Sequence, residues 1–196
     1  MLPLLRDQPR CRRTDPVARR YHLRSDAPRL PKAQTVIQIR KTTDDDHIAI
    51  SILLVSAFGQ PNEARLIEAL RADGSVAHEL VAPHDGEVVG HACLSRLRAP
   101  EGWLALGPIS VRTALQGQGL GGELVRYALD AARQSEAKAV VVVGDPIYYH
   151  RFGFVFDGPA ELTSGYPTQY TGLYPIAPET ASARADLVYP APFADV

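Results

Sequence analysis

Residues 116–122 read Gln116-Gly117-Gln118-Gly119-Leu120-Gly121-Gly122, and this stretch decides the fold. It follows an apolar segment, and a run of good helix formers from Glu123 to Gln134 comes directly after it. Glycines lack a Cβ atom, so the backbone can approach a bound group closely. The first turn of a helix also presents unpaired N–H groups and the positive end of the helix dipole. The stretch therefore predicts a loop that binds a phosphate group.

Two phosphate-binding patterns overlap in this loop. Gly117, Gly119 and Gly122 form G-x-G-x-x-G, and Asp145 lies 23 residues beyond Gly122, where a dinucleotide site has its ribose-binding acid. Gln116, Gly119 and Gly121 form Q-x-x-G-x-G, which resembles the pyrophosphate loop of the GNAT superfamily of N-acetyltransferases. A Walker loop is excluded because no Lys-Ser or Lys-Thr follows the glycines.

The surrounding sequence favours the second pattern. A dinucleotide loop turns directly off its strand, whereas residues 112–116 separate the strand end at Val111 from Gly117. Only 51 residues follow Asp145, and they show no long helical pattern for further strand–helix units. The strand from Trp103 to Val111 also contains Gly107-Pro108, and proline cannot donate to a sheet ladder. Pairing on one side of this strand should therefore stop near its middle.

A second segment resembles the same superfamily. Residues 144–154 read Gly-Asp-Pro-Ile-Tyr-Tyr-His-Arg-Phe-Gly-Phe, and Tyr149, Gly153 and Phe154 fit the superfamily's Tyr-x-x-x-Gly-Phe. The segment is similar to the YhbS-like branch of bacterial acetyltransferases, as are residues 57–59, Glu63 and residues 90–91. The likeness covers about residues 35 to 158. It implies the α/β GNAT (acyl-CoA N-acyltransferase) fold: a mixed, mostly antiparallel sheet with flanking helices, whose fourth and fifth strands splay around the pantetheine arm of coenzyme A.

The resemblance implies an acetyl-CoA-dependent N-acetyltransferase that moves an acetyl group to a primary amine by direct attack on the thioester. Acetyl-CoA is then the cosubstrate, and an unidentified amine is the acceptor. Backbone N–H groups of the splayed strand would polarise the thioester carbonyl as an oxyanion hole does. The residues expected to bind coenzyme A are Ile109, Ser110, Val111, Gln116, Gly117, Gln118, Gly119, Leu120, Gly121 and Gly122.

Acetyl transfer needs a base for the ammonium and an acid for the departing thiolate. Tyr149 takes the superfamily's general-acid position, although a tyrosine there could simply pack beside Phe152 and Phe154. The strand from Trp103 to Val111 carries no acidic residue, so the sequence does not identify the general base. Glu63 is one candidate, or only an acid that suits the first turn of a helix. His91 is another, or only a satisfied buried histidine, and a water chain is a third route.

The rest of the chain predicts elements that suit this fold. Apolar alternation indicates strands at 35–41, 78–83 and 87–97, with Asp85-Gly86 as a hairpin turn. Thr43 with three following aspartates predicts a helix start, and Ile48, Ile52 and Val55 form its apolar stripe, the face expected to meet the core. Pro61 predicts the start of a second helix. Residues 139–143 predict a buried parallel strand, and residues 185–189 a final strand.

Charge divides the chain unevenly. The chain has 21 basic and 22 acidic residues. Residues 1–34 contain nine basic and three acidic residues, so residues 35–196 contain 12 basic and 19 acidic residues. Residues 1–34 are predicted to be a disordered basic tail or an over-extended start, and residues 35–196 one GNAT domain. The two cysteines form no metal-binding spacing, so no metal is expected. No membrane span or nucleic-acid partner is expected, a homodimer stays open, and a cytoplasmic location is expected.

Three functions are compatible with the sequence. The first is the acetyltransferase, and the second is a non-catalytic acyl-CoA-binding module, supported by the missing strand acid. The third is an NAD(P)-dependent oxidoreductase, which rests on the overlapping dinucleotide pattern and Asp145. The net negative charge of residues 35–196 favours a cationic acceptor. Tyr166, Tyr170 and Tyr174 either line an acceptor pocket or lie at a surface.

Overall fold

The computed structural model describes residues 37–195 of the 196-residue chain. The predicted tail, residues 1–34, lies outside the described residues. The helices are α1 (His47–Phe58), α2 (Asn62–Ala72), α3 (Leu120–Gln134) and α4 (Pro146–Tyr149). The strands are β1 (Arg40–Lys41), β2 (Val76–His84), β3 (Glu87–Arg96), β4 (Trp103–Val111), β5 (Ala139–Val143), β6 (Glu161–Thr163), β7 (Thr171–Pro175) and β8 (Arg184–Asp186).

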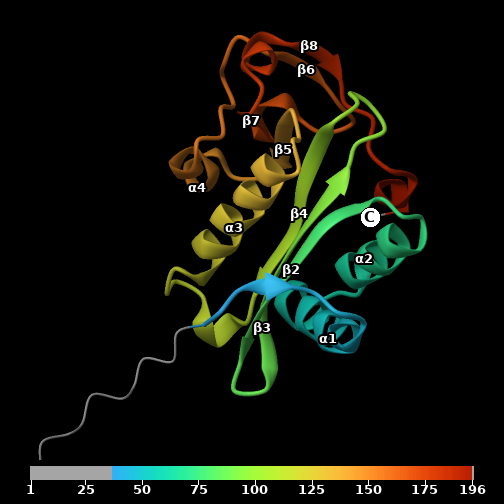
Figure 1. Ribbon diagram of the computed structural model, residues 1–196, viewed down its shortest axis with the longest axis vertical. Helices are drawn as coiled ribbons and strands as arrows, with labels where there is room; N and C mark the ends of the chain where they lie inside the picture. The colour runs from blue at the N-terminus through green and yellow to red at the C-terminus, as the bar shows by residue number, and fades with distance from the viewer. Residues whose placement is uncertain (1–36, 196) are drawn as a thin grey trace, which may run out of the picture. The chain divides into compact units, whose positions relative to one another are not determined.

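One mixed sheet with the strand order β1-β2-β3-β4-β5-β7 organises these elements (Figure 1). Every neighbouring pair is antiparallel except β4 and β5, which run parallel. The hairpin between β2 and β3 turns at Asp85 and Gly86, whose φ angles are 51° and 79°. Such positive values suit the Asp-Gly turn that the sequence predicts. The mixed, mostly antiparallel sheet expected from the resemblance is therefore present.

Helices cover both faces of the sheet. Figure 1 shows α3 on the opposite side of the sheet from α1 and α2. On the α3 side, Leu124 and Val125 of the helix pack with Val140 and Phe154 in the larger apolar core. On the other side, Ile67 and Leu70 of α2 pack with Val81 in a second core. Both faces of the central strands are therefore buried, which explains their long apolar runs.

The two parallel strands separate part-way along their length. The β4–β5 register runs from Trp103 opposite Ala139 to Leu106 opposite Val142 and goes no further. Gly107 and Pro108 follow immediately, and Gly107 has a φ of 150°, which favours glycine. Beyond them, Ile109 still pairs with β3 but has no β5 partner. The break that the proline predicts is therefore present, and it opens the sheet toward the glycine loop.

The expected buried stripe of α1 is wrong. Ile48, Ile52 and Val55 are 77%, 66% and 42% exposed, whereas Ile50, Leu53 and Leu54 are buried. The helix sequence HIAISILLVSAF is apolar on nearly every side, so its periodicity does not identify the face that meets the sheet. Tertiary packing makes that choice.

The C-terminal part also differs from the expectation. Residues 184–186 form β8, but this strand pairs with β6 in a separate two-stranded sheet. The last strand of the main sheet is instead β7, antiparallel to β5, which the sequence pattern does not predict. Proline-rich turns interrupt the apolar pattern of this region and hide the short strand.

Two findings concern residues 37–195 alone. None of their helices combines the length and apolar character needed to cross a membrane. Within the same residues, no group of three or more His, Cys, Asp or Glu side chains is placed to hold a metal ion.

Candidate active site

The glycine loop turns sharply into α3. Gly117 and Gly119 have φ angles of 73° and 95°, values that side chains disfavour, and Gly119 caps the first turn of the helix. The Gln116 amide Nε2 donates a hydrogen bond to the Val111 carbonyl oxygen at 3.0 Å. This bond ties the loop to the end of β4. The unpaired N–H groups of the first turn of α3 therefore lie beside the open part of β4.

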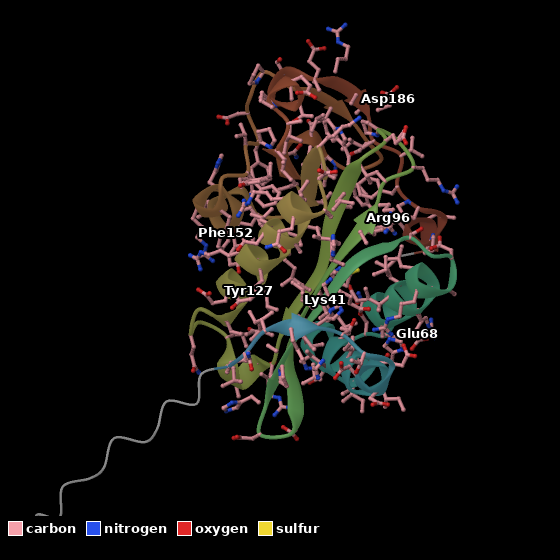
Figure 2. The ribbon with its side chains drawn as sticks, viewed as in Figure 1. Lys41, Glu68, Arg96, Tyr127, Phe152 and Asp186 are labelled. Carbon is pink, nitrogen blue, oxygen red and sulfur yellow. The ribbon has the colours of Figure 1, made fainter. Side chains whose placement is uncertain are left out.

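Two later glycines of the loop lie against aromatic side chains. A Cβ atom on Gly121 would lie 2.9 Å from the Tyr148 hydroxyl oxygen, and one on Gly122 would lie 3.4 Å from the Phe152 ring. Both aromatic residues belong to the segment after β5, and Figure 2 places Phe152 beside α3. The two motifs that the sequence singles out are therefore brought together in space.

A cavity of about 450 Å³ lies over this loop. We call it the glycine-loop cavity, and it is lined by Ile109, Val111, Gln116, Gly117, Gly119, Gly121, Gly122, Tyr148, Tyr149 and Arg151. The Arg151 guanidinium lies 4.0 Å from the centre of the Tyr148 ring. A cation held on an aromatic face beside helix N–H groups suits a phosphate ligand. Sequence reasoning missed Tyr148 and Arg151, although both lie within two residues of Tyr149.

A second cavity, of about 370 Å³, lies on the other side of the separated strands. We call it the aromatic cavity, and it is lined by Phe58, Glu63, Leu66, Ala105, Leu106, Gly107, Pro108, Ile109, Val141, Val143, Tyr149, Tyr166, Tyr189 and Phe193. It combines residues of α1, α2, β4 and β5 with residues from the end of the chain. Of the three tyrosines weighed as acceptor residues, Tyr166 lines it. Tyr170 is 48% exposed, and Tyr174 packs against Phe154.

Ile109 and Tyr149 line both cavities. The Tyr149 ring packs edge-on against Phe154, with centres 5.6 Å apart, and lies so close to Gly144 that a Cβ atom there would be 2.5 Å from the ring. Burial, and to a lesser degree the neighbouring Tyr148, raises the pKa of Tyr149 to about 12. Tyr149 is therefore a protonated donor near neutral pH, held rigidly at the junction of the two cavities.

Three residues expected to bind coenzyme A do not line the glycine-loop cavity. Leu120 is buried in the core near Gly90, and the Gln118 side chain donates to the Ala114 carbonyl oxygen at 3.1 Å. Ser110 is buried, and its register partner across β3 is His91. Along a strand, neighbouring side chains point to opposite faces, so Ser110 points away from the side on which Ile109 and Val111 meet the cavity.

The two candidate bases occupy different environments. Glu63 lines the aromatic cavity and accepts a hydrogen bond from Gln60 at 3.2 Å. His91 is fully buried and lines neither cavity, and its Nε2 atom lies 2.8 Å from Glu79. Burial lowers the pKa of His91, although Glu79 opposes this, so the imidazole is neutral near pH 7. The structure brings only Glu63 to a cavity.

Comparison with known proteins matches residues 40–154 to the acetyltransferase (GNAT) family. The chain belongs to this family. It is 35% identical to the uncharacterized N-acetyltransferase YhbS of Escherichia coli over 133 residues, which are 66% of this chain and 80% of YhbS. Acetyl-CoA-dependent N-acetyl transfer is the activity of this family.

Two solved GNAT structures are similar to this chain over most of its length. A crystal structure of Escherichia coli YhbS in complex with CoA has a TM-score of 0.76 and 30% identity, covering 81% of this chain and 92% of that chain. A GNAT acetyltransferase from Brucella melitensis in complex with acetyl-CoA has a TM-score of 0.70 and 33% identity, covering 80% and 97%.

Family membership replaces the dinucleotide interpretation of the loop. Asp145, the expected ribose-binding acid of that interpretation, instead caps α4: its Oδ1 atom accepts a hydrogen bond from the Ile147 N–H at 2.9 Å. The sheet has one parallel pair and is not the doubly wound parallel sheet of a dinucleotide fold. The family match ends at residue 154, so Tyr166, Tyr189 and Phe193 of the aromatic cavity lie beyond it.

Proposed function

We propose that this chain binds acetyl-CoA in the glycine-loop cavity and transfers the acetyl group to a primary amine held in the aromatic cavity. The junction of the two cavities at Ile109 and Tyr149 carries the proposal. The loop, the first turn of α3 and Arg151 suit the pyrophosphate, and the unpaired side of β4 suits the pantetheine arm. The thioester would then end where the second cavity begins.

Each step of the transfer can be assigned to a group that lines one of the two cavities. The amine nitrogen forms the new bond to the acetyl carbon, and the carbon–sulfur bond breaks. The proton of the Tyr149 hydroxyl passes to the departing sulfur, so that coenzyme A leaves as a thiol. The proton lost by the amine passes to the Glu63 carboxylate, directly or through water, because Glu63 is the only carboxylate among the described residues that line the aromatic cavity. The proton that Glu63 accepts then passes to the Tyr149 oxygen, directly or through water, and restores both groups for the next turnover.

A dedicated base on β4 is absent from Trp103–Val111, and the proposal does not need one. His91 is not assigned the proton transfer, because it lines neither cavity and is hydrogen-bonded to Glu79. Its neutral ring belongs instead to a buried network that joins β2 and β3.

Replacement of Tyr149 by Phe tests the proposal. The variant keeps the ring and its packing but removes the proton donor, so kcat should fall about 100-fold while acetyl-CoA affinity changes little. Thiol release with a panel of primary amines measures turnover, and calorimetry measures binding. Tyr127→Phe is the matched control, since this tyrosine of α3 is 46% exposed and lines neither cavity.

The results separate the remaining functions. A wild-type chain that binds acetyl-CoA but acetylates no amine would be an acyl-CoA-binding module. Full activity of Tyr149→Phe would remove Tyr149 from the mechanism and leave water as the proton donor. Binding of NADH in place of acetyl-CoA would overturn the proposal altogether.

A further inference from the structure

The wall of the aromatic cavity is almost without charge. Glu63 is the only acidic or basic side chain among its lining residues in the described part of the chain. We propose that the acceptor is a small amine with a single ammonium group and an apolar body, best an aryl ring. Its ammonium would lie at Glu63 and its body against Tyr166, Tyr189 and Phe193. This inference rests on the function proposed above.

Three aromatic side chains form one continuous wall. The ring centres of Tyr166 and Tyr189 are 5.2 Å apart with planes at 79°, and those of Tyr189 and Phe193 are 5.1 Å apart. Burial raises the pKa of Tyr166, and burial also raises that of Tyr189, where Tyr166 adds to the effect. Both phenols are therefore neutral near pH 7. Such a wall favours an edge-on or offset aryl ring over a charged or strongly hydrated chain.

The single carboxylate limits the number of charges that the acceptor can carry. One ammonium can pair with Glu63 before it loses its proton. A second ammonium further along the acceptor would find no second carboxylate among the described residues of the wall, so no ion pair would offset the loss of its hydration. A carboxylate on the acceptor would be repelled by Glu63 and would find no cation among the described residues of the wall. Polyamines and free amino acids are therefore disfavoured.

The size of the aromatic cavity suits a small molecule, and part of its wall comes from residues beyond the family match. The cavity of about 370 Å³ lies near the lower end of the range for small-molecule sites, about 300 to 1,000 Å³. Phe193 lies in the final turn Ala191–Asp195 and packs against the core formed with α1 and α2. Residues after the family match thus close the cavity against the helices. We infer that this C-terminal segment sets the choice of acceptor.

Two amines that differ only in one charge give the first test. The value of kcat/KM is measured with the full chain and acetyl-CoA for pentylamine, 1,5-diaminopentane, 2-phenylethylamine and N-acetyl-lysine amide, which is acetylated on its α-nitrogen. Pentylamine should exceed the diamine by about tenfold or more, the ratio that 1.4 kcal/mol produces. 2-Phenylethylamine should equal or exceed pentylamine. Equal or better turnover of the diamine, or of N-acetyl-lysine amide over 2-phenylethylamine, would overturn the substrate class.

A variant of the wall gives the second test. Phe193→Ala should reduce kcat/KM for 2-phenylethylamine about tenfold more than for ethylamine, which has no body to pack against the ring. Tyr127→Ala is the control, because Figure 2 places this residue on α3 and it does not line the cavity. The control should keep the wild-type ratio between the two amines. An equal loss for both amines in Phe193→Ala would show a structural role only and would overturn the assignment of the wall.

Failure of this inference differs from failure of the proposed function. Acetylation of the diamine or the lysine amide alone would leave an acetyltransferase with another acceptor class. Acetylation of none of these amines, together with no calorimetric binding of 2-phenylethylamine to the CoA-bound chain, would overturn both.

Discussion

Gly144 controls where the Tyr149 ring can lie. A Cβ atom at Gly144 would be 2.5 Å from the ring, and Phe154, which is buried, packs against the same ring. The ring therefore cannot absorb the extra atom without moving the hydroxyl from the cavity junction. We expect Gly144→Ala to lower kcat by about tenfold to 100-fold, because small misplacements of a catalytic group are costly. Steady-state thiol release measures the change.

Gly165→Ala is the matched control for this prediction. A Cβ atom on Gly165 would have no other atom within 4 Å, and the residue has no positive φ, so the substitution should leave turnover unchanged. Acetyl-CoA affinity should also be nearly unchanged in Gly144→Ala, since Gly144 does not line the glycine-loop cavity. Normal kcat in Gly144→Ala would show that the position of the Tyr149 ring is not important for turnover.

Among larger elements, the loop between β4 and α3 combines backbone strain with a proposed role in binding. Gly119 has a φ of 95° and begins α3, so Gly119→Ala should lower the free energy of unfolding by about 1–2 kcal/mol. It should also weaken acetyl-CoA binding, because the N–H groups of the first turn would be displaced. Gly74→Ala separates the two effects: Gly74 has a φ of 74° but lies between α2 and β2. Denaturation and calorimetry on both variants measure stability and binding.

Equal affinity for acetyl-CoA in the Gly119 and Gly74 variants would contradict the assigned role of the loop. A loss of stability without a loss of acetyl-CoA affinity would show that Gly119 serves only as the N-cap of α3.

Local signals explain which elements the sequence could predict. The glycine loop, the Asp85-Gly86 turn and the proline in β4 each depend on a few adjacent residues, and all three are in place. The buried face of α1 depends instead on which side meets the sheet, and an almost wholly apolar helix carries no local record of that choice. The strand β7 likewise depends on pairing with β5, about 30 residues earlier in the chain.

The orientation of α1 gives a prediction at the same scale. Leu54 is fully buried, so Leu54→Ala should lower the free energy of unfolding by about 2–5 kcal/mol. Ile52 is 66% exposed, so Ile52→Ser should change it by about 0.5 kcal/mol or less. Chemical denaturation of both variants tests the orientation. A larger loss in Ile52→Ser than in Leu54→Ala would restore the face that the sequence pattern favours.

At the scale of the whole molecule, the site is only partly visible in the sequence. The residues proposed to bind through their backbone stand in a motif, and Tyr149 stands at a fixed spacing from Gly153. Tyr189 and Phe193 reach the aromatic cavity only because the chain returns across the molecule after β8. Arg151 lies against the Tyr148 ring and lines the glycine-loop cavity, whose glycines lie about 30 residues earlier in the chain. Side chains brought together only by the tertiary structure have no fixed spacing in the sequence, so no motif identifies them.

A buried ionic network links α2 to the centre of the sheet. Arg71 of α2 donates two hydrogen bonds to the Glu79 carboxylate of β2, at 2.6 and 3.0 Å. Glu79 also lies 2.8 Å from His91 Nε2 on β3. Burial raises the pKa of Glu79, but the hydrogen bonds from His91 and Arg71 outweigh it and lower the pKa to about 2. Removal of one partner from such a network typically costs about 3–5 kcal/mol.

This network predicts that acid destabilises the protein in two steps. The folded state lowers the pKa of His91, chiefly by burial, so the stability tied to its neutral form is present above its ordinary pKa of 6.5 and is lost as pH falls below it. The stability from Glu79 is lost only below its ordinary pKa of 4.5, as pH falls toward 2.

His91→Gln keeps a donor for Glu79 but cannot titrate. The free energy of unfolding, measured by denaturant at pH 7, 5.5 and 4, should therefore fall less steeply from pH 7 to 5.5 in this variant. His78, whose pKa burial also lowers, keeps some slope in every variant. An unchanged slope in His91→Gln would place the acid sensitivity outside this network.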